Sequence, residues 1–109
     1  MANNGQLYHV WVYVPQDAKE RVKAAMFEAG AGAIGNYRAC SWETKGTGQF
    51  MPLEGSAPAI GSLGRLENVD EYKVEMVVSA AFLNCVIAAM KSAHPYEEPA
   101  YGAVLLADV

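Results

Sequence analysis

The chain has few cysteines, no long apolar run and only a mild excess of charge of one sign. Its two cysteines, Cys40 and Cys85, are too few for a disulfide framework and do not form a Cys-x-x-Cys pair. No apolar run reaches the roughly 18 residues that a membrane-spanning helix needs, so no membrane association is expected. The net charge of −4 offers no basic surface for a phosphate backbone, so nucleic acid is not an expected partner.

The beginning of the chain also lacks a targeting signal. Residues 1–6 are short and polar, without the basic and apolar regions of a secretory signal peptide. Together with two cysteines that fit free thiols, this predicts a cytoplasmic protein. Cys85 falls in an apolar helical pattern and is expected to be a small buried side chain.

What the chain does have is enough length and apolar content for one packed domain. About half of its 109 residues, 52%, are apolar, which excludes a disordered tail. We expect a single domain over residues 1–109, with an ordered core from about residue 7 to residue 106.

Two strand–helix units with similar patterns predict the fold class. In each, a run rich in aromatic and β-branched residues precedes apolar residues at helical spacing. The expected elements are strands at 7–14, 36–43, 69–78 and 100–106, and helices at 17–29 and 80–93. With right-handed crossovers, this order gives an α+β, ferredoxin-like βαββαβ fold, in which a four-stranded antiparallel sheet carries both helices on one face.

Between the second and third strands the sequence predicts a turn and a long loop. Lys45-Gly46-Thr47-Gly48 is a turn signal, after which 49–53 returns as a short strand. The tetrapeptide also resembles part of a phosphate-binding loop, but the full pattern is missing and no helix follows, so a hairpin turn is favoured. Residues 54–64 are rich in Gly, Pro and Ser and form a loop that is long for so small a domain.

The first strand is largely apolar on both faces. Val10, Val12 and Val14 alternate with Trp11 and Tyr13. Helices cover one face of the expected sheet, so another copy of the chain or another partner is expected to cover the other.

The residues with the most chemistry are concentrated in 94–101, His-Pro-Tyr-Glu-Glu-Pro-Ala-Tyr. One interpretation is a ligand or metal site, because histidine with carboxylates suits zinc or another borderline divalent cation. The candidate metal ligands are His94, Glu97 and Glu98. The other interpretation is structural: His94 caps the second helix, while Tyr96 and Tyr101 pack. The structural interpretation is favoured, because one histidine with two adjacent carboxylates is a weak metal spacing.

Nucleophilic catalysis has little support in the sequence. No serine lies in a nucleophile elbow. Cys40 has Arg38 two residues away on the same strand face, which would favour its thiolate only slightly, and no histidine base is near it in sequence. A small hydrolase or thiol enzyme is therefore a disfavoured class.

Several motifs occur together and carry a family resemblance. They are Phe27-Glu28-Ala29-Gly30-Ala31-Gly32, Ile34-Gly35-Asn36-Tyr37, Cys40-Ser41, Gly46-Thr47-Gly48-x-Phe50-x-Pro52, Pro58-x-Ile60-Gly61 and the segment 94–101. In combination they resemble the insert domain of YqfO-type members of the NIF-three-like family, here as a stand-alone protein. The resemblance covers residue 7 to about residue 106, and the His-Pro-Tyr-Glu-x-Pro piece also resembles CutA.

The resemblance implies a PII/CutA-like form of the ferredoxin-like fold and, because such relatives are commonly trimers, a homo-oligomer, either trimer or dimer. The dinuclear metal site of the full-length family lies in a body that these residues do not contain, so its hydrolase chemistry is not carried over. What is implied is a non-catalytic binding, regulatory or assembly module with a small ligand or a protein partner. The alternative is a divalent-metal-binding, CutA-like protein. The expected ligand or interface residues are Gly46, Thr47, Gly48, Tyr96 and Tyr101.

Overall fold

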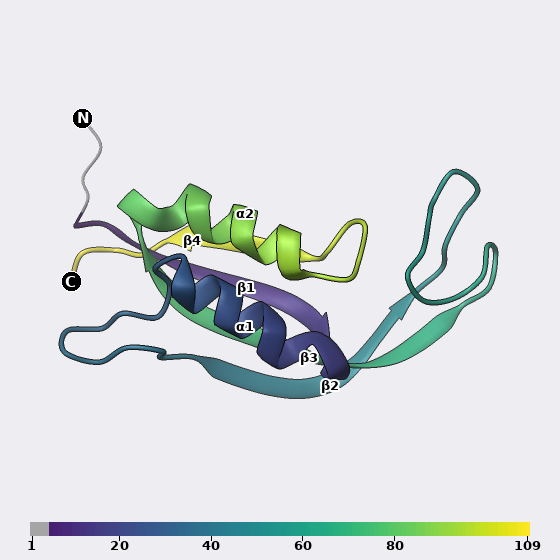
Figure 1. Ribbon diagram of the computed structural model, residues 1–109, viewed down its shortest axis with the longest axis horizontal. Helices are drawn as coiled ribbons and strands as arrows, with labels where there is room; N and C mark the ends of the chain where they lie inside the picture. Colours follow the sequence, from purple (N-terminus) through teal and green to yellow (C-terminus); the bar gives the residue numbers. More distant parts are fainter. Residues whose placement is uncertain (1–4) are drawn as a thin grey trace.

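The structure, a computed structural model, describes residues 5–109; residues 1–4, part of the polar start in which no signal peptide was found, lie outside the described residues. Its elements are β1 (Leu7–Pro15), α1 (Lys19–Glu28), β2 (Trp42–Phe50), β3 (Glu67–Ser79), α2 (Leu83–Ala93) and β4 (Tyr101–Leu105). The strands form one antiparallel sheet in the order β2-β3-β1-β4 (Figure 1). Within residues 5–109, no helix has the length and apolar character needed to cross a membrane.

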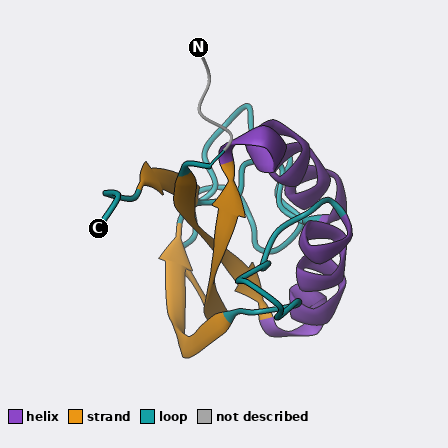
Figure 2. Ribbon diagram, turned by 90° about the vertical axis from the view of Figure 1, so that its left-hand side faces the viewer, coloured by secondary structure: helices purple, strands orange, loops and turns teal. Residues whose placement is uncertain are grey.

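The predicted fold class is confirmed. Both helices cover one face of the sheet and leave the other face bare (Figure 2). Alternate residues of β1 and β3 point toward the helices, as the period-two pattern of a strand requires. The fully buried side chains on these strands and on the two helices are Val10, Val12, Val14, Val74, Val78, Val22, Met26, Val86 and Met90.

The prediction for the second strand was wrong. The segment 36–43 is not a strand as a whole, because β2 begins at Trp42 and runs to Phe50 through the expected turn at 45–48. Its glycines are interior strand residues: Gly46 stands opposite Glu71 in the register, and Gly48 lies under the Glu71 side chain. A strand glycine often marks such a close approach. The chain reverses instead in the loop 51–66, which contains the long loop expected at 54–64. The separate short strand expected at 49–53 was also wrong, because 49–50 are the end of β2 and 51–53 belong to the loop.

The helices begin slightly later than predicted, and one cysteine prediction was wrong. A single 3-10 turn precedes each helix, and Ser79 stands at an N-cap position without a side-chain hydrogen bond. Cys85 is exposed rather than buried. The reason is rotational: Val86 and Met90 occupy the stripe of α2 that faces the core, and Cys85 lies beside that stripe.

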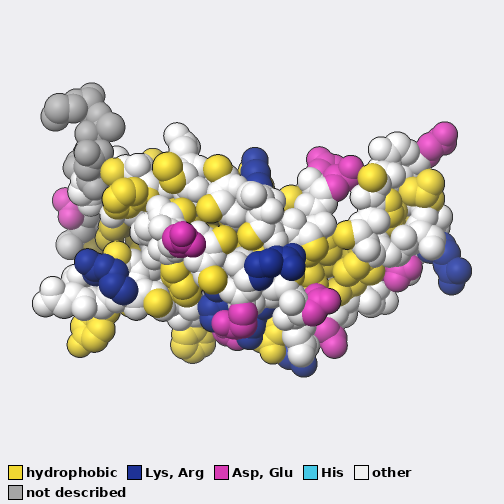
Figure 3. Space-filling view, viewed as in Figure 1, with side chains coloured by type: hydrophobic (Ala, Val, Ile, Leu, Met, Phe, Trp, Pro, Cys, Tyr) yellow, Lys and Arg dark blue, Asp and Glu magenta, His cyan; other side chains and the backbone are white. Residues whose placement is uncertain are grey.

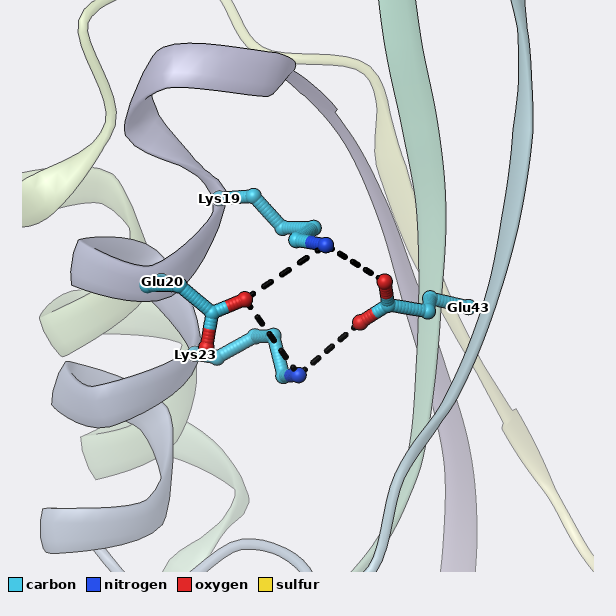
Figure 4. A network of polar contacts seen from close by, with 4 residues as sticks. All are labelled: Lys19, Glu20, Lys23 and Glu43. Atoms are coloured by element: carbon cyan, nitrogen blue, oxygen red, sulfur yellow. Dashed lines mark hydrogen bonds and ion pairs between the residues drawn. The ribbon is translucent and has the colours of Figure 1, made fainter.

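Charged side chains join α1 to the edge strand β2 on the helix-covered side (Figure 4). Glu43 accepts from Lys19 Nζ at 2.5 Å and from Lys23 Nζ at 2.9 Å, and Glu20 lies 3.5 and 3.7 Å from the same two nitrogens. The hydrogen bond from Lys19 lowers the pKa of the Glu43 carboxyl, and the same bond raises the pKa of Lys19. The network holds the edge of the sheet against the first helix.

The hairpin of β2 and β3 extends beyond the rest of the sheet as an arm, residues 49–68 (Figure 1). The molecule is therefore elongated, with extents of 45 × 27 × 24 Å and a radius of gyration of 15.0 Å. A compact domain of this length would have a radius of gyration of about 13 Å. The arm carries exposed apolar side chains, namely Met51, Leu53, Leu63 and Leu66.

Candidate functional site

A pocket of about 340 Å³ lies where the arm meets the sheet and the loop between α2 and β4. The sheet contributes its floor, the loop contributes carboxylates and a phenol, and the arm contributes an apolar wall. The principal lining residues are Tyr13, Gly48, Phe50, Pro52, Pro58, Ile60, Glu71, Tyr96, Glu97 and Glu98. In Figure 3 apolar side chains gather at the junction between the body and the arm.

Glu71 is the buried charge of this pocket. It lies on the face of β3 that the helices do not cover, and its side chain passes over Gly48 with 9% of the residue exposed. Its Oε2 accepts a hydrogen bond from the Tyr96 hydroxyl at 2.7 Å. Burial, together with this bond, raises the pKa of Tyr96, so the phenol remains a donor. Among residues 5–109, no lysine, arginine or histidine forms an ion pair with Glu71.

His94 supports the pocket from behind. It is the C-cap residue of α2, and its backbone N–H donates to the Met90 carbonyl at 2.9 Å. In its side chain, Nδ1 accepts from the Tyr96 N–H at 3.1 Å, and Nε2 contacts the Tyr13 carbonyl at 2.8 Å. Because Nδ1 accepts a hydrogen bond it carries no proton, so the ring proton lies on Nε2, which donates to that carbonyl. Burial lowers the pKa of His94, in keeping with a neutral ring. The ring thus fixes Tyr96 relative to β1.

The loop between α2 and β4 also holds the arm. Glu97 Oε1 accepts a hydrogen bond from the Ala57 N–H at 2.9 Å. The rings of Phe50 and Tyr96 lie 6.0 Å apart between centroids at an interplanar angle of 55°. Segments far apart in the sequence are therefore joined around one pocket.

The structure brings together most of the residues predicted to form the site. Gly48, Tyr96, Glu97 and Glu98 line the pocket. Gly46 and Thr47 line an adjoining groove, while His94 lies behind Tyr96. Tyr101 does not contribute to the pocket, because it stands opposite Val12 on the helix-covered face with Lys91 Nζ 5.1 Å from its ring centroid.

Glu71 and Phe50 were missed by the sequence interpretation. The positions of both residues in the pocket depend on the register between β2 and β3. The prediction of a turn at 45–48 left no such register to consider. The available signal was Gly48: a glycine inside a strand pattern indicates a close approach by a neighbouring side chain.

The geometry gives the predicted metal site no direct support. Among the described residues there is no cluster of three His, Cys, Asp or Glu side chains arranged to hold a metal ion. Both ring nitrogens of His94 already take part in hydrogen bonds, and Glu97 binds the arm. Coordination by His94 would require one of its two bonds to be released.

Cys40 lies in a different, shallow hollow on the other end of the sheet. His9 and Trp42 line the same hollow. However, His9 Nε2 lies 3.0 Å from Glu75 Oε1, and the Cys40 thiol lies 3.8 Å from the Arg38 carbonyl. The His9 ring and the Cys40 thiol therefore contact other groups and do not form a Cys–His pair.

Curated relatives cover most of this chain, although no protein-family model matches it. A protein of Mycobacterium tuberculosis is 56% identical over 92 residues, which are 84% of this chain and 24% of the relative. One of Halalkalibacterium halodurans is 49% identical over 102 residues, 94% of this chain and 27% of the relative. Both are named GTP cyclohydrolase 1 type 2 homolog. The chain spans about a quarter of the length of these relatives.

Solved structures agree with this match. A Bacillus cereus protein related to NIF3 has a TM-score of 0.82 and 40% identity, over 98% of this chain and 27% of that chain. CutA of Archaeoglobus fulgidus has a TM-score of 0.67 and 17% identity, over 94% of this chain and 86% of that chain, which shows the shared fold. The predicted family resemblance is confirmed. Over most of its length the chain is similar to NIF3-related proteins, of which it spans about a quarter, and it shares its fold with CutA.

Proposed function

We propose that this chain is a non-catalytic binding and assembly module that self-associates through the bare face of its sheet. We call this surface the open face. It comprises Leu7, His9, Trp11, Tyr13, Trp42, Lys73, Glu75, Val77 and Val104. The observation that carries the proposal is the exposure of its apolar members: Trp42 is 69% exposed and Val104 51% exposed. Exposed apolar surface of this kind favours association.

A second copy of the chain is the occupant that the structure favours. The arm extends past its own sheet and presents exposed apolar side chains of its own. The open face also carries both signs of charge, Lys73 and Glu75, with Nζ and Oε1 3.9 Å apart. A face with both apolar and paired charged groups can be complementary to the same surface on a copy of itself.

The pocket supports a binding role rather than a catalytic one. Hydrogen bonds that hold the pocket together already engage the side chains of His94, Tyr96 and Glu97. The relatives are named as homologs of a GTP cyclohydrolase, and we propose that any such activity belongs to the other three quarters of those longer proteins. The thiols of Cys40 and Cys85 are free, which is compatible with the cytoplasmic location that the sequence predicts.

Divalent-metal binding is the second candidate, with His94 and either Glu97 or Glu98 as ligands. Its support is that structural neighbours such as the Archaeoglobus fulgidus protein are named as divalent cation tolerance proteins. At 17% identity that likeness extends to the fold alone. The hydrogen bonds of His94 count against this candidate.

Native mass spectrometry of the purified chain tests both candidates, because it reports assembly and retained metal together. Two matched variants sharpen the test. Val104→Lys places a charge on the open face, and Leu105→Lys places the same charge on the next residue, which points to the other face of β4. The two wild-type residues are similarly exposed, at 51% and 48%.

We expect the wild-type chain and the Leu105→Lys variant to form the same oligomer. We expect the Val104→Lys variant to be a monomer. A wild-type monomer at high micromolar concentration, or equal behaviour of the two variants, would contradict assembly through the open face. A stoichiometric metal mass that disappears in His94→Ala would instead favour the second candidate.

A further inference from the structure

The pocket between the arm and the sheet combines a buried carboxylate with apolar walls. Glu71 is 9% exposed and receives one hydrogen bond from a neutral donor, the Tyr96 hydroxyl. Burying a carboxylate is costly unless the charge is paired. No cation of residues 5–109 lies within ion-pair distance of it. The pocket therefore contains a negative charge whose natural partner is a positive group from another molecule.

The other lining residues restrict the charge and the shape of that molecule. Glu97 and Glu98 add two more carboxylates at the rim, and neither lysine nor arginine is among the lining residues, so a phosphate or carboxylate ligand would meet repulsion. The apolar wall consists of Phe50, Pro52, Pro58 and Ile60. Such a wall accepts a flat hydrocarbon or aromatic body.

The volume restricts the size of the ligand. At about 340 Å³ the pocket is at the small end of the range for small-molecule sites. It fits a compact molecule better than a peptide segment. Its floor is also fixed, because His94 holds Tyr96 and Tyr96 holds the Glu71 carboxylate. Such a preformed site loses little freedom on binding.

We propose that this pocket binds a small flat organic cation, with an amidinium, guanidinium or protonated amino-heterocycle group donating hydrogen bonds to Glu71. The aromatic or apolar body of the ligand lies against the arm, beside Phe50 and Ile60. The inference rests on the proposed role of the chain as a binding module, but it does not depend on self-association.

Three isosteric probes test the charge requirement on the 109-residue chain: benzamidine, benzamide and benzoate. Their binding is followed by titration in two-dimensional ¹H–¹⁵N NMR spectra. We expect benzamidine to shift the resonances of Gly48, Phe50 and Tyr96 and to bind at least about tenfold more tightly than benzamide, with benzoate weaker still, since a charged hydrogen bond contributes more than a neutral one. Equal affinity for benzamidine and benzamide, or no shifts with any probe, would overturn the proposal.

Two variants localise the effect. Glu71→Gln keeps an acceptor for Tyr96 but removes the charge, and should lower the affinity for benzamidine to that for benzamide. Asp70→Asn removes the same charge from the exposed neighbouring residue, which points to the opposite face of β3, and should bind like the wild type. Benzamidine binding that survives in a folded Glu71→Gln variant would be evidence against the site. The comparison of the three probes on the wild-type chain remains decisive if that variant does not fold.

The same titration separates this inference from the proposed assembly. We expect benzamidine to bind both the wild-type chain and Val104→Lys, and native mass spectrometry with benzamidine present to show the same number of chains in the wild-type oligomer. If the oligomer forms without binding benzamidine, the ligand inference is wrong while assembly stands. If benzamidine dissociates the oligomer, a basic side chain of another copy occupies the pocket, and the small-molecule inference is wrong.

Discussion

At the scale of single residues, the site depends on three side chains that position one another. His94 accepts from the Tyr96 backbone, Tyr96 donates to Glu71, and Glu71 lies over Gly48. The segment 94–101 could be recognised from sequence, because it concentrates imidazole, phenol and carboxylate groups. Its role could not, because the roles of His94 and Tyr96 follow from contacts with Tyr13 and Glu71, which are 81 and 25 residues away in the chain.

Gly48→Ala tests this dependence. A Cβ at Gly48 would lie 1.9 Å from Glu71 Oε1, so the carboxylate must move and its bond with Tyr96 must weaken. We expect the free energy of unfolding to fall by about 1–3 kcal/mol, the usual cost of disturbing a buried hydrogen bond. Chemical denaturation measures the change.

Gly46→Ala is the matched control, because nothing lies within 4 Å of the Cβ that it would add. We expect its effect to stay within about 0.5 kcal/mol. Equal destabilisation by the two substitutions would show that strand geometry, rather than the Glu71 side chain, requires glycine at Gly48.

At the scale of elements, β2 differs most from the sequence interpretation. The glycines and lysine of 45–48 predicted a turn. The segment instead continues as a strand, because residues 67–75 of β3 supply backbone partners along the whole of β2. Tertiary pairing overrides local preference more readily for strands than for helices. The edge strand is also held from the helix side, through Glu43 and the two lysines of α1 (Figure 4).

Glu43→Gln tests the contribution of that network. Because the network lies close to solvent, we expect a modest loss of stability, smaller than that of Gly48→Ala, and one that shrinks as salt is raised. Hydrogen bonds from Lys19 and Lys23 lower the pKa of Glu43, so its contribution is fully present above the ordinary carboxyl pKa of 4.5 and is lost as pH falls from there through the lowered pKa.

Urea denaturation at low and high salt measures the effect of Glu43→Gln. Glu20→Gln is the control, since Glu20 lies farther from the same lysines with 76% of its side chain exposed. A larger loss in Glu20→Gln would place the anchor within α1 rather than between α1 and β2.

At the scale of the whole molecule, the core and the arm are separable. The buried apolar residues of the core lie outside 51–66, where Pro52 is the one described residue that is buried. The base of the arm loop is already closed, because the Gly64 N–H donates to the Pro52 carbonyl at 2.6 Å. The arm therefore serves the pocket and the exposed surface more than the stability of the fold.

Replacing residues 53–63 with an Asn-Gly turn tests this separation. We expect cooperative unfolding to persist, with the free energy of unfolding of the monomer changed by about 1 kcal/mol or less, since shortening a loop has a small entropic effect. Self-association should weaken by roughly tenfold or more, and benzamidine binding should be lost with the arm wall. Sedimentation measurements and the NMR titration provide the two readouts, and loss of the folded spectrum would show that the arm is part of the core after all.

The sequence by itself determined the order of elements, the helix-facing stripes and the family resemblance, because hydrophobic periodicity and short motifs are local properties of a chain. It also indicated that one face of the sheet would be left bare. Only the tertiary structure decided the path of β2, the place of Glu71 in the pocket and the exclusion of Tyr101 from it. The physical reason is register: a shift of one residue between paired strands exchanges the two faces of a sheet, and no local pattern in 42–50 fixes which residue of β3 it meets.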